Sequence, residues 1–211
     1  MTRILLIRHG STDLLGRVLY GRMPGVHLNE EGRKQARAAG VALKMRYTVD
    51  AVVSSPLERA TETAGLIADL QGLQVSIEEG LNEVDCGSWI GKPFPELNEL
   101  EDWRQFNQLR SLTRAPGGES LLEVQARAWK SLEDIQARHQ DGTVAAITHG
   151  DVIRSLLLLL LGMPLDHILR LEVAPASVSE ILLGGRAPLV RSINQSIWLA
   201  TRDNEGTTFN A

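Results

Sequence analysis

Four consecutive aliphatic residues near the start of the chain, at positions 4–7, constrain its fold more than any other stretch. Because no polar residue alternates with them, they are typical of a strand buried on both faces, at the centre of a sheet that helices cover. Arg8, His9 and Gly10 follow directly. Ligands of open α/β folds bind at the carboxyl ends of the strands. We therefore expect Arg8 and His9 to lie at a ligand-binding edge.

A second buried strand is predicted at residues 143–147, and it too is followed by a histidine and a glycine, His149 and Gly150. Asp151 is then expected to cap an apolar helix over residues 152–161. A purely structural account does not require two buried strands to deliver a histidine at the same edge. We therefore expect His9 and His149 to share one site.

Residues that begin helices stand between the predicted strands. Asn29 is a suitable N-cap, and Ser55 followed by Pro56 marks the start of another helix. Ser120 and Glu123 have the spacing of a capping box. Further strands are expected at 51–54, 75–77, 178–183 and 189–193. This order predicts an α/β fold, a three-layer α/β/α sandwich with a mostly parallel central sheet.

The length of 211 residues, with 43% hydrophobic and 23% charged residues, fits one domain spanning 1–211. Residues 92–119 differ from the rest, because prolines and glycines bracket a charged amphipathic segment. We interpret this segment as a small helical insertion that lies over the site like a lid.

Charge and cysteine content exclude several classes of protein. The net charge of -4 carries no polybasic signature, so nucleic acid is not an expected partner. A single cysteine, Cys86, rules out an intrachain disulfide and predicts a reducing compartment, the cytoplasm. The longest apolar run, residues 155–161, is far shorter than the ~20 residues that a membrane span needs. No membrane partner is expected either.

Three more charged residues belong to the predicted site or compete for it. Arg59 falls in the first turn of the helix that follows Ser55, where a bound anion would lie, although an exposed ion pair is the plainer interpretation of that residue alone. Glu83 and Asp85 lie on the same side of an extended segment. Either carboxyl group could donate a proton, and Glu83 is our first choice.

Together these residue types suit phosphoryl transfer. Two arginines neutralise the phosphoryl oxygens without a metal, and a neutral His9 imidazole attacks the phosphorus. A protonated His149 holds an oxygen, while a carboxyl group of raised pKa protonates the leaving alkoxide and later activates water. The residues to which we assign these catalytic roles are Arg8, His9, Arg59, Glu83 and His149.

With these residues in this order, the chain resembles the histidine phosphatase superfamily, in its phosphoglycerate mutase-like branch. The resemblance rests on an ordered set of segments: 6–10 (LIRHG), 28–36 (LNEEGRKQA), 54–64 (SSPLERATETA), 81–83 (LNE), 87–89 (GSW), 116–120 (PGGES) and 148–150 (THG). It implies that His9 is the phosphorylated nucleophile and that Glu83 is the proton donor. It also implies that Arg8, Arg59 and His149 bind the phosphate.

The leading prediction is a phosphomonoester hydrolase that acts on a small phosphorylated metabolite, with no metal and no cofactor. Ser11 stands where many relatives have Glu, and 14–15 (Leu-Leu) fall where mutases carry Trp-Asn, so the substrate is expected to differ from theirs. The residues expected to bind substrate are Arg8, Ser11, Leu15, Tyr20, Gly21, Arg59 and His149.

Three alternatives remain beside it. The same residues could serve a cofactor-dependent phosphoglycerate mutase. A phospholigand-binding module without activity is disfavoured, because the catalytic set is intact. A metallohydrolase using His9, His149, Glu83 and Asp85 as ligands is disfavoured too, because the sequence has no HxxxH, HxH or HExxH spacing.

Overall fold

A computed structural model describes residues 1–196 of the chain. A six-stranded sheet forms its centre, in the order β3-β2-β4-β1-β5-β6. The strands are β1 (Thr2–Arg8), β2 (Ala51–Ser54), β3 (Val75–Ile77), β4 (Thr143–Thr148), β5 (Val178–Leu183) and β6 (Leu189–Gln195). Strands β1 to β4 run parallel, whereas β5 and β6 are antiparallel to their neighbours. The sheet is therefore mixed and mostly parallel.

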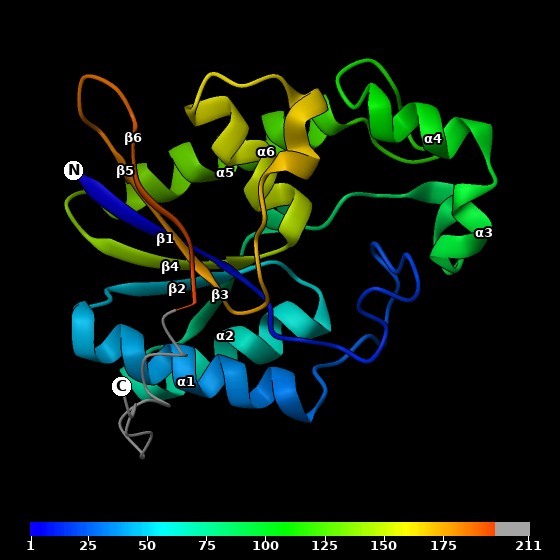
Figure 1. Ribbon diagram of the computed structural model, residues 1–211. Helices are drawn as coiled ribbons and strands as arrows, with labels where there is room; N and C mark the ends of the chain where they lie inside the picture. Colours follow the sequence, from blue (N-terminus) through cyan, green and yellow to red (C-terminus); the bar gives the residue numbers. More distant parts are fainter. Residues whose placement is uncertain (197–211) are drawn as a thin grey trace, which may run out of the picture.

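Helices cover both faces of this sheet (Figure 1). One face carries α1 (Glu30–Arg46) and α2 (Glu58–Gln71), and the other carries α5 (Leu121–Arg138) and α6 (Gly150–Leu160). The predicted α/β fold with three layers is confirmed. Short 3-10 turns complete the described chain at η1 (Glu79–Leu81), η2 (Gly87–Trp89) and η3 (Leu165–Arg170). No helix in residues 1–196 is long and apolar enough to cross a bilayer.

Strand β1 lies between β4 and β5, and residues 4–7 are fully buried, as their unbroken apolar pattern predicts. Ile4 and Leu6 pack into the core beneath α5 and α6, whereas Leu5 and Ile7 pack against α1 and α2. Continuing this alternation sends Arg8 toward α6 and His9 toward α2. The core packing of β1 therefore fixes which side of the sheet each functional side chain serves.

The insertion at 92–119 forms two short helices, α3 (Phe94–Asn98) and α4 (Glu101–Gln108), rather than one. Both lie beyond the carboxyl ends of β1 and β4 (Figure 1). Trp103 and Phe106 of α4 are buried against Trp89, with ring centroids 5.2 to 5.3 Å apart in edge-to-face arrangements. These two aromatic residues therefore serve packing within the insertion.

Two predicted helix starts are wrong. Helix α2 begins at Glu58, and its N-cap is Leu57, whose apolar side chain makes no cap hydrogen bond. The hydroxyl of Ser55 lies 2.7 Å from His149 and accepts the amide of Leu57 only at 3.5 Å. Helix α6 begins at Gly150 with His149 as its N-cap, so Asp151 lies in the first turn rather than at the cap. The N-cap Asn29 of α1 and the Ser120 capping box of α5 are confirmed. In both wrong predictions, the polar side chain forms a tertiary contact that a local pattern does not reveal.

The segment after His9 touches the start of α1 backbone to backbone. A Cβ added to Gly32 would lie 2.1 Å from the carbonyl oxygen of Ser11, which is too close for any side chain. Gly10 has the reciprocal constraint, since its Cβ would lie 2.4 Å from the carbonyl oxygen of Gly32. This contact fixes the backbone beside His9 against a helix end.

We expect Gly32→Ala to destabilise the protein by at least about 2 kcal/mol, because backbone atoms must separate to admit the methyl group. The matched control is Gly65→Ala in α2, where nothing lies within 4 Å of the added Cβ. That change should stabilise the protein by about 0.5–1 kcal/mol through helix propensity. Urea unfolding measures the change in the free energy of unfolding of both variants, from the shift of the midpoint at constant m-value. Equal midpoints for the two variants would contradict the tight contact.

Candidate active site

The two histidines predicted to share a site lie side by side. Strands β1 and β4 pair in parallel register, and the amide of His9 donates to the carbonyl of Thr148 at 3.0 Å. The rings of His9 and His149 are consequently 5.2 Å apart, centroid to centroid, and edge to face. Both side chains are buried. The structure therefore brings them together at the carboxyl edge of the sheet, as the strand pattern predicts.

The hydrogen bonds of His9 define its tautomer. Its Nδ1 lies 2.7 Å from the carbonyl of Gly10, which can only accept, so Nδ1 carries the proton. Nε2 receives the Nε–H of Arg59 at 3.3 Å and therefore presents a lone pair. Burial, followed by the positive charges of Arg59 and Arg8, holds the pKa of His9 well below its usual range. A neutral imidazole whose Nε2 carries no proton is the form that a nucleophile requires.

Arg59 is completely buried, so the interpretation of an exposed ion pair is wrong. From the first turn of α2, its Nη2 donates to the carbonyl of Gly21 at 2.7 Å. Its guanidinium also stacks over the ring of Tyr20, 4.7 Å from the centroid. These contacts fix the guanidinium against His9.

Three buried side-chain nitrogens at this edge have no hydrogen-bond partner among the described residues. They are Nε of Arg8, Nη1 of Arg59 and Nδ1 of His149. Buried polar groups are rarely left unpaired, so a set of three around one nucleophile indicates a site for an external acceptor. Arg8 is anchored by Nη1, which donates to the carbonyl of Val173 at 2.6 Å. The arrangement can hold a tetrahedral oxyanion.

The protonation state of His149 differs from the expected one, since the structure favours a neutral imidazole. Burial lowers its pKa well below the usual range, and the nearby charge of Arg59 and the His9 ring lower it further. The hydroxyl of Ser55 lies 2.7 Å from Nε2, and this nitrogen is the one acceptor among the hydrogen-bond partners of that hydroxyl in the described residues, so we assign the hydroxyl as the donor. The network thus assigns the proton to Nδ1. A neutral His149 still presents an N–H to the site.

Glu83 lies on the other side of His149, with Oε2 3.7 Å from Nδ1. Its Oε1 accepts from the amide of Val84 at 2.9 Å. Burial raises the pKa of Glu83 to about 6, and the Asp151 carboxylate raises it in the same direction, against the charge of Arg59. This carboxyl group can hold and release a proton near neutral pH.

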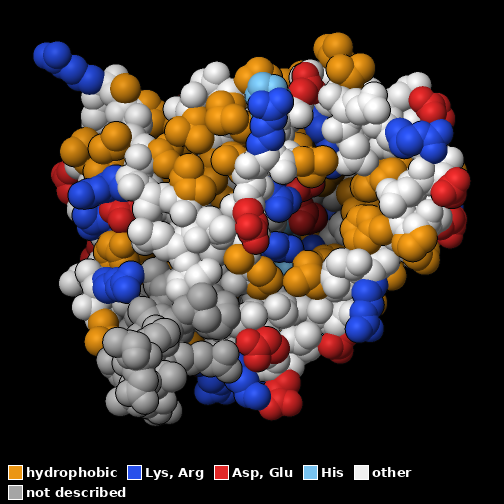
Figure 2. All heavy atoms as spheres, in the orientation of Figure 1, with side chains coloured by type: hydrophobic (Ala, Val, Ile, Leu, Met, Phe, Trp, Pro, Cys, Tyr) orange, Lys and Arg blue, Asp and Glu red, His pale blue; other side chains and the backbone are white. Residues whose placement is uncertain are grey.

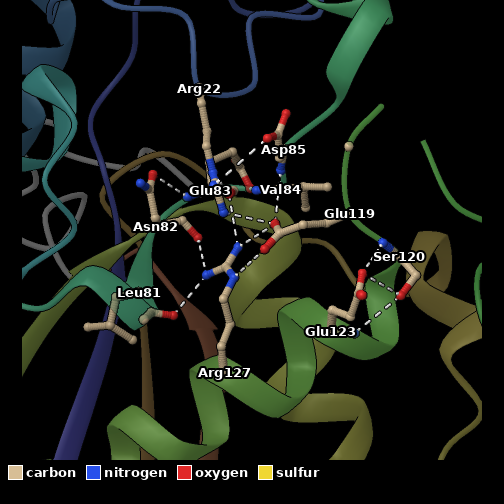
Figure 3. Close-up of polar contacts among 12 residues, drawn as sticks. Arg22, Leu81, Asn82, Glu83, Val84, Asp85, Glu119, Ser120, Glu123 and Arg127 are labelled. Atoms are coloured by element: carbon tan, nitrogen blue, oxygen red, sulfur yellow. Dashed lines mark hydrogen bonds and ion pairs between the residues drawn. The ribbon is translucent and has the colours of Figure 1, made fainter. Parts of the chain in front are cut away.

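A network of arginines holds the backbone of Glu83 (Figure 3). Arg22 and Arg127 each donate to the carbonyl of Glu83, at 2.8 and 2.9 Å. Both also bond to one carboxylate, Glu119, which accepts the amide of Asp85 as well. Glu119 lies in segment 116–120, which carries part of the family resemblance, whereas nothing in the sequence distinguishes Arg127 from a surface arginine of α5.

Asp85, our second choice of proton donor, points elsewhere. Its carboxylate accepts the amide of Gly87 at 3.0 Å and lies 4.0 Å from Nη1 of Arg22. It therefore stabilises its own turn. Cys86 is buried and unpaired, and burial raises the pKa of its thiol, in agreement with a structural role.

A pocket that Arg8 and Glu83 help to line encloses about 580 Å³, counting the part open to solvent. Figure 2 shows this face hollowed, with charged side chains inside the hollow and hydrophobic side chains around it. Of the predicted substrate-binding residues, Leu15, Tyr20 and Gly21 line the pocket together with Arg8. Arg59 and His149, like the nucleophile His9, are buried and are not among the residues that line it. Ser11 does not line it either, and its backbone is bound to Gln35 and Asn29 near the start of α1. The described residues contain no cluster of three or more His, Cys, Asp or Glu side chains that could hold a metal.

Comparison with known proteins places this geometry in context. The family model described as histidine phosphatase superfamily (branch 1) matches residues 4–196. The bifunctional protein Rv2228c of Mycobacterium tuberculosis is 37% identical over 202 residues, covering 94% of this chain but 55% of that protein. The chain thus spans about half the length of that relative.

Two further relatives match over nearly their whole length. Phosphoserine phosphatase 1 of Hydrogenobacter thermophilus is 31% identical over 196 residues, which are 92% of each chain. A phosphoserine phosphatase mutant of Entamoeba histolytica, solved in complex with phosphoserine, superposes with a TM-score of 0.82 at 27% identity, covering 94% of this chain and all of that one. Both relatives are similar to this chain in length, and the solved one, which is in complex with phosphoserine, is similar in fold as well.

Proposed function

Because this chain belongs to the histidine phosphatase superfamily, branch 1, we propose that it is a metal-independent phosphomonoester hydrolase that works through a phosphohistidine. The observation that carries the proposal is the neutral His9, whose Nε2 lone pair lies among three buried side-chain nitrogens without hydrogen-bond partners in the described residues. The substrate class is a small phosphorylated metabolite. We further propose that residues 1–211 are one domain of this family, with 92–119 as its lid-like insertion.

In the first step, Nε2 of His9 attacks the phosphorus and the bond to the leaving oxygen breaks. Arg8, Arg59 and the Nδ1–H of His149 bind the equatorial phosphoryl oxygens, and their charge and fixed orientation stabilise the transition state. The carboxyl group of Glu83 gives its proton to the leaving oxygen, so an alcohol departs. Glu83 is left as a carboxylate.

In the second step, water attacks the phosphorus of the phosphohistidine and the P–N bond breaks. The Glu83 carboxylate takes the proton that the water loses, which restores the carboxylic acid. His9 returns to its neutral form and phosphate leaves. Because the two arginines already supply positive charge at the phosphoryl group, the cycle needs no metal ion.

We expect kcat/KM to fall above about pH 6, because Glu83, with its pKa raised to about 6, must be protonated to act as an acid. Glu83→Gln should lower kcat/KM roughly 10²–10⁴-fold and abolish this limb of the pH profile. The matched control, Asp85→Asn in the same loop, should keep the limb. Initial rates across pH 4–9 provide the measurement. A limb that persists in Glu83→Gln belongs to the substrate or another group and contradicts this role.

A mutase on the same catalytic residues would need free cations around a second anionic group of a bisphosphate. Four basic residues from the segments around the pocket pair with carboxylates instead: Arg22 with Glu119, Lys92 with Glu96, Arg110 with Asp151, and Arg114 with Glu123. The exposed Arg17 is the exception, since no carboxylate in the described part of the chain pairs with it. We therefore favour water as the phosphoryl acceptor.

The test of the function compares the two acceptors. The protein is incubated with 3-phosphoglycerate and a catalytic amount of the 2,3-bisphosphate, and in parallel with an alkyl monophosphate, each with and without EDTA. We expect phosphate release that EDTA leaves unchanged. Isomerisation much faster than phosphate release would favour the mutase. Turnover that requires a divalent ion would favour the metallohydrolase, and no turnover with tight phosphate binding would favour the binding module.

A further inference from the structure

We infer that the leaving group of the substrate is an uncharged, largely apolar alcohol, and that the pocket rejects a second anionic group. This inference rests on the proposed function, since it concerns the part of the ester that the hydrolase releases. It follows from the lining of the pocket, from the way its wall is built and from the pairing of its charges.

The outer wall of the pocket is apolar. Leu15, Val18, Leu19 and Phe94 line it and are partly exposed, and Val84 adds to the floor. Side chains of this kind bury a ligand by excluding water and offer no hydrogen bonds. A leaving group of several carbon atoms would cover them.

This wall is fixed by backbone hydrogen bonds between two segments far apart in sequence. The amide of Leu19 donates to the carbonyl of Lys92 at 3.0 Å, and the amide of Gly91 donates to the carbonyl of Leu19 at 2.8 Å. The amide of Phe94 donates to the carbonyl of Arg17 at 3.2 Å. The ring of Phe94 also packs against Trp103, with centroids 6.3 Å apart. The apolar surface is therefore preformed.

Apart from Arg8 of the phosphate site, the charged side chains that line the pocket are carboxyl groups or a cation already paired with one of them. Arg154 lines the pocket, but its Nη1 bonds to Asp151 at 2.8 Å and its Nε to the carbonyl of Leu171 at 2.8 Å. Asp151 and Glu83 line the same pocket. Beyond the phosphate site, a second anionic group would meet two carboxyl groups and a cation already bound to one of them. Because Glu83 is protonated in the reactive form and Asp151 is paired with Arg110 and Arg154, the site offers a second anionic group no free cation to offset the loss of its hydration.

The inference is tested with three esters whose alkoxides have similar basicity: methyl phosphate, hexyl phosphate and 6-(phosphonooxy)hexanoate. The last two have the same chain length and differ in a terminal carboxylate. We expect kcat/KM for hexyl phosphate to exceed that of each of the other esters by about tenfold or more, the range that a few methylene contacts supply. Equal or faster hydrolysis of the carboxylate ester would overturn the inference.

Variants assign the preference to residues. Phe94→Ala should reduce the ratio of hexyl to methyl phosphate kcat/KM by about tenfold, since its contact with the alkyl chain is lost. Asp151→Asn should raise the ratio of kcat/KM for the carboxylate ester to kcat/KM for hexyl phosphate. The control is Leu112→Ala, because Leu112 belongs to the same insertion, is 81% exposed and does not line the pocket. In this variant, the hexyl-to-methyl ratio and the carboxylate-to-hexyl ratio of kcat/KM should stay unchanged. An unchanged hexyl-to-methyl ratio in Phe94→Ala would also overturn the inference.

These outcomes separate the inference from the function on which it rests. Hydrolysis of methyl phosphate in every variant reports an intact phosphate site and a folded protein. If none of the three esters is hydrolysed by the unaltered protein and no phosphoenzyme forms, the proposed function fails. If all are hydrolysed without preference, the function stands and the inference fails.

Discussion

Replacing His9 by alanine is expected to lower phosphate release by about 10⁴-fold or more, because the change removes the atom that forms the covalent bond. The unaltered protein, quenched in alkaline detergent during turnover of a ³²P-labelled ester, should retain label on the chain. A phosphohistidine is a phosphoramidate, so this label should be lost in acid and survive in base. His9→Ala should carry none.

The matched control is His27→Ala. His27 lies in a loop, its ring is 56% exposed and it bonds to Glu62, outside the site. Its replacement should leave both turnover and labelling unchanged. Label that persists in His9→Ala, or full turnover by that variant, would show that another group is the nucleophile and would contradict the mechanism.

Arg59→Ala is expected to lower kcat roughly 10²–10³-fold, which is the usual cost of losing one preorganised donor to a developing oxyanion. The expected loss of kcat is near the upper end of this range, because Arg59 also donates to Nε2 of His9 and to the carbonyl of Gly21. Arg59→Lys retains the charge but not the fork of donors, so its loss should be intermediate. Added guanidinium should restore part of the activity of Arg59→Ala, since it fits the space left.

A second arginine provides the control for this prediction. Arg33 pairs with Glu62 on the exposed side of α1, and Arg33→Ala should have normal kcat. Because Arg59 is buried, urea unfolding of Arg59→Ala must first show a folded protein. A folded Arg59→Ala with normal kcat would contradict the assignment of this guanidinium to the phosphoryl group.

The sequence predicts best what local patterns determine. The unbroken apolar run before Arg8 and the similar run before His149 identify two buried strands, and the parallel pairing of such strands brings their ends together. The capping box of Ser120 and Glu123 could be predicted because both of its partners lie within one turn. Each of these features depends on residues close in sequence or on a rule of sheet geometry.

The remainder depends on tertiary partners that no local pattern specifies. Ser55 has the spacing of a helix cap, but its hydroxyl orients His149 94 residues away. Arg59 has the position of a surface residue and is buried because Gly21 and Tyr20 come from another loop. The sequence around Arg127 in α5 does not distinguish it from an exposed arginine, and only the fold shows that it donates to the carbonyl of Glu83.

The wall formed by 15–19 and 91–94 has a consequence for how new specificities can evolve in this chain. Its two segments are joined by amide and carbonyl groups, which every residue except proline supplies. Leu15, Val18 and Phe94 can therefore be exchanged one at a time without breaking the bonds that hold the wall. The nucleophile and its donors lie at the sheet edge and depend on none of these three side chains. Gene duplication followed by substitutions at these three positions could thus yield paralogues that share one chemical step and differ in the alcohol they release.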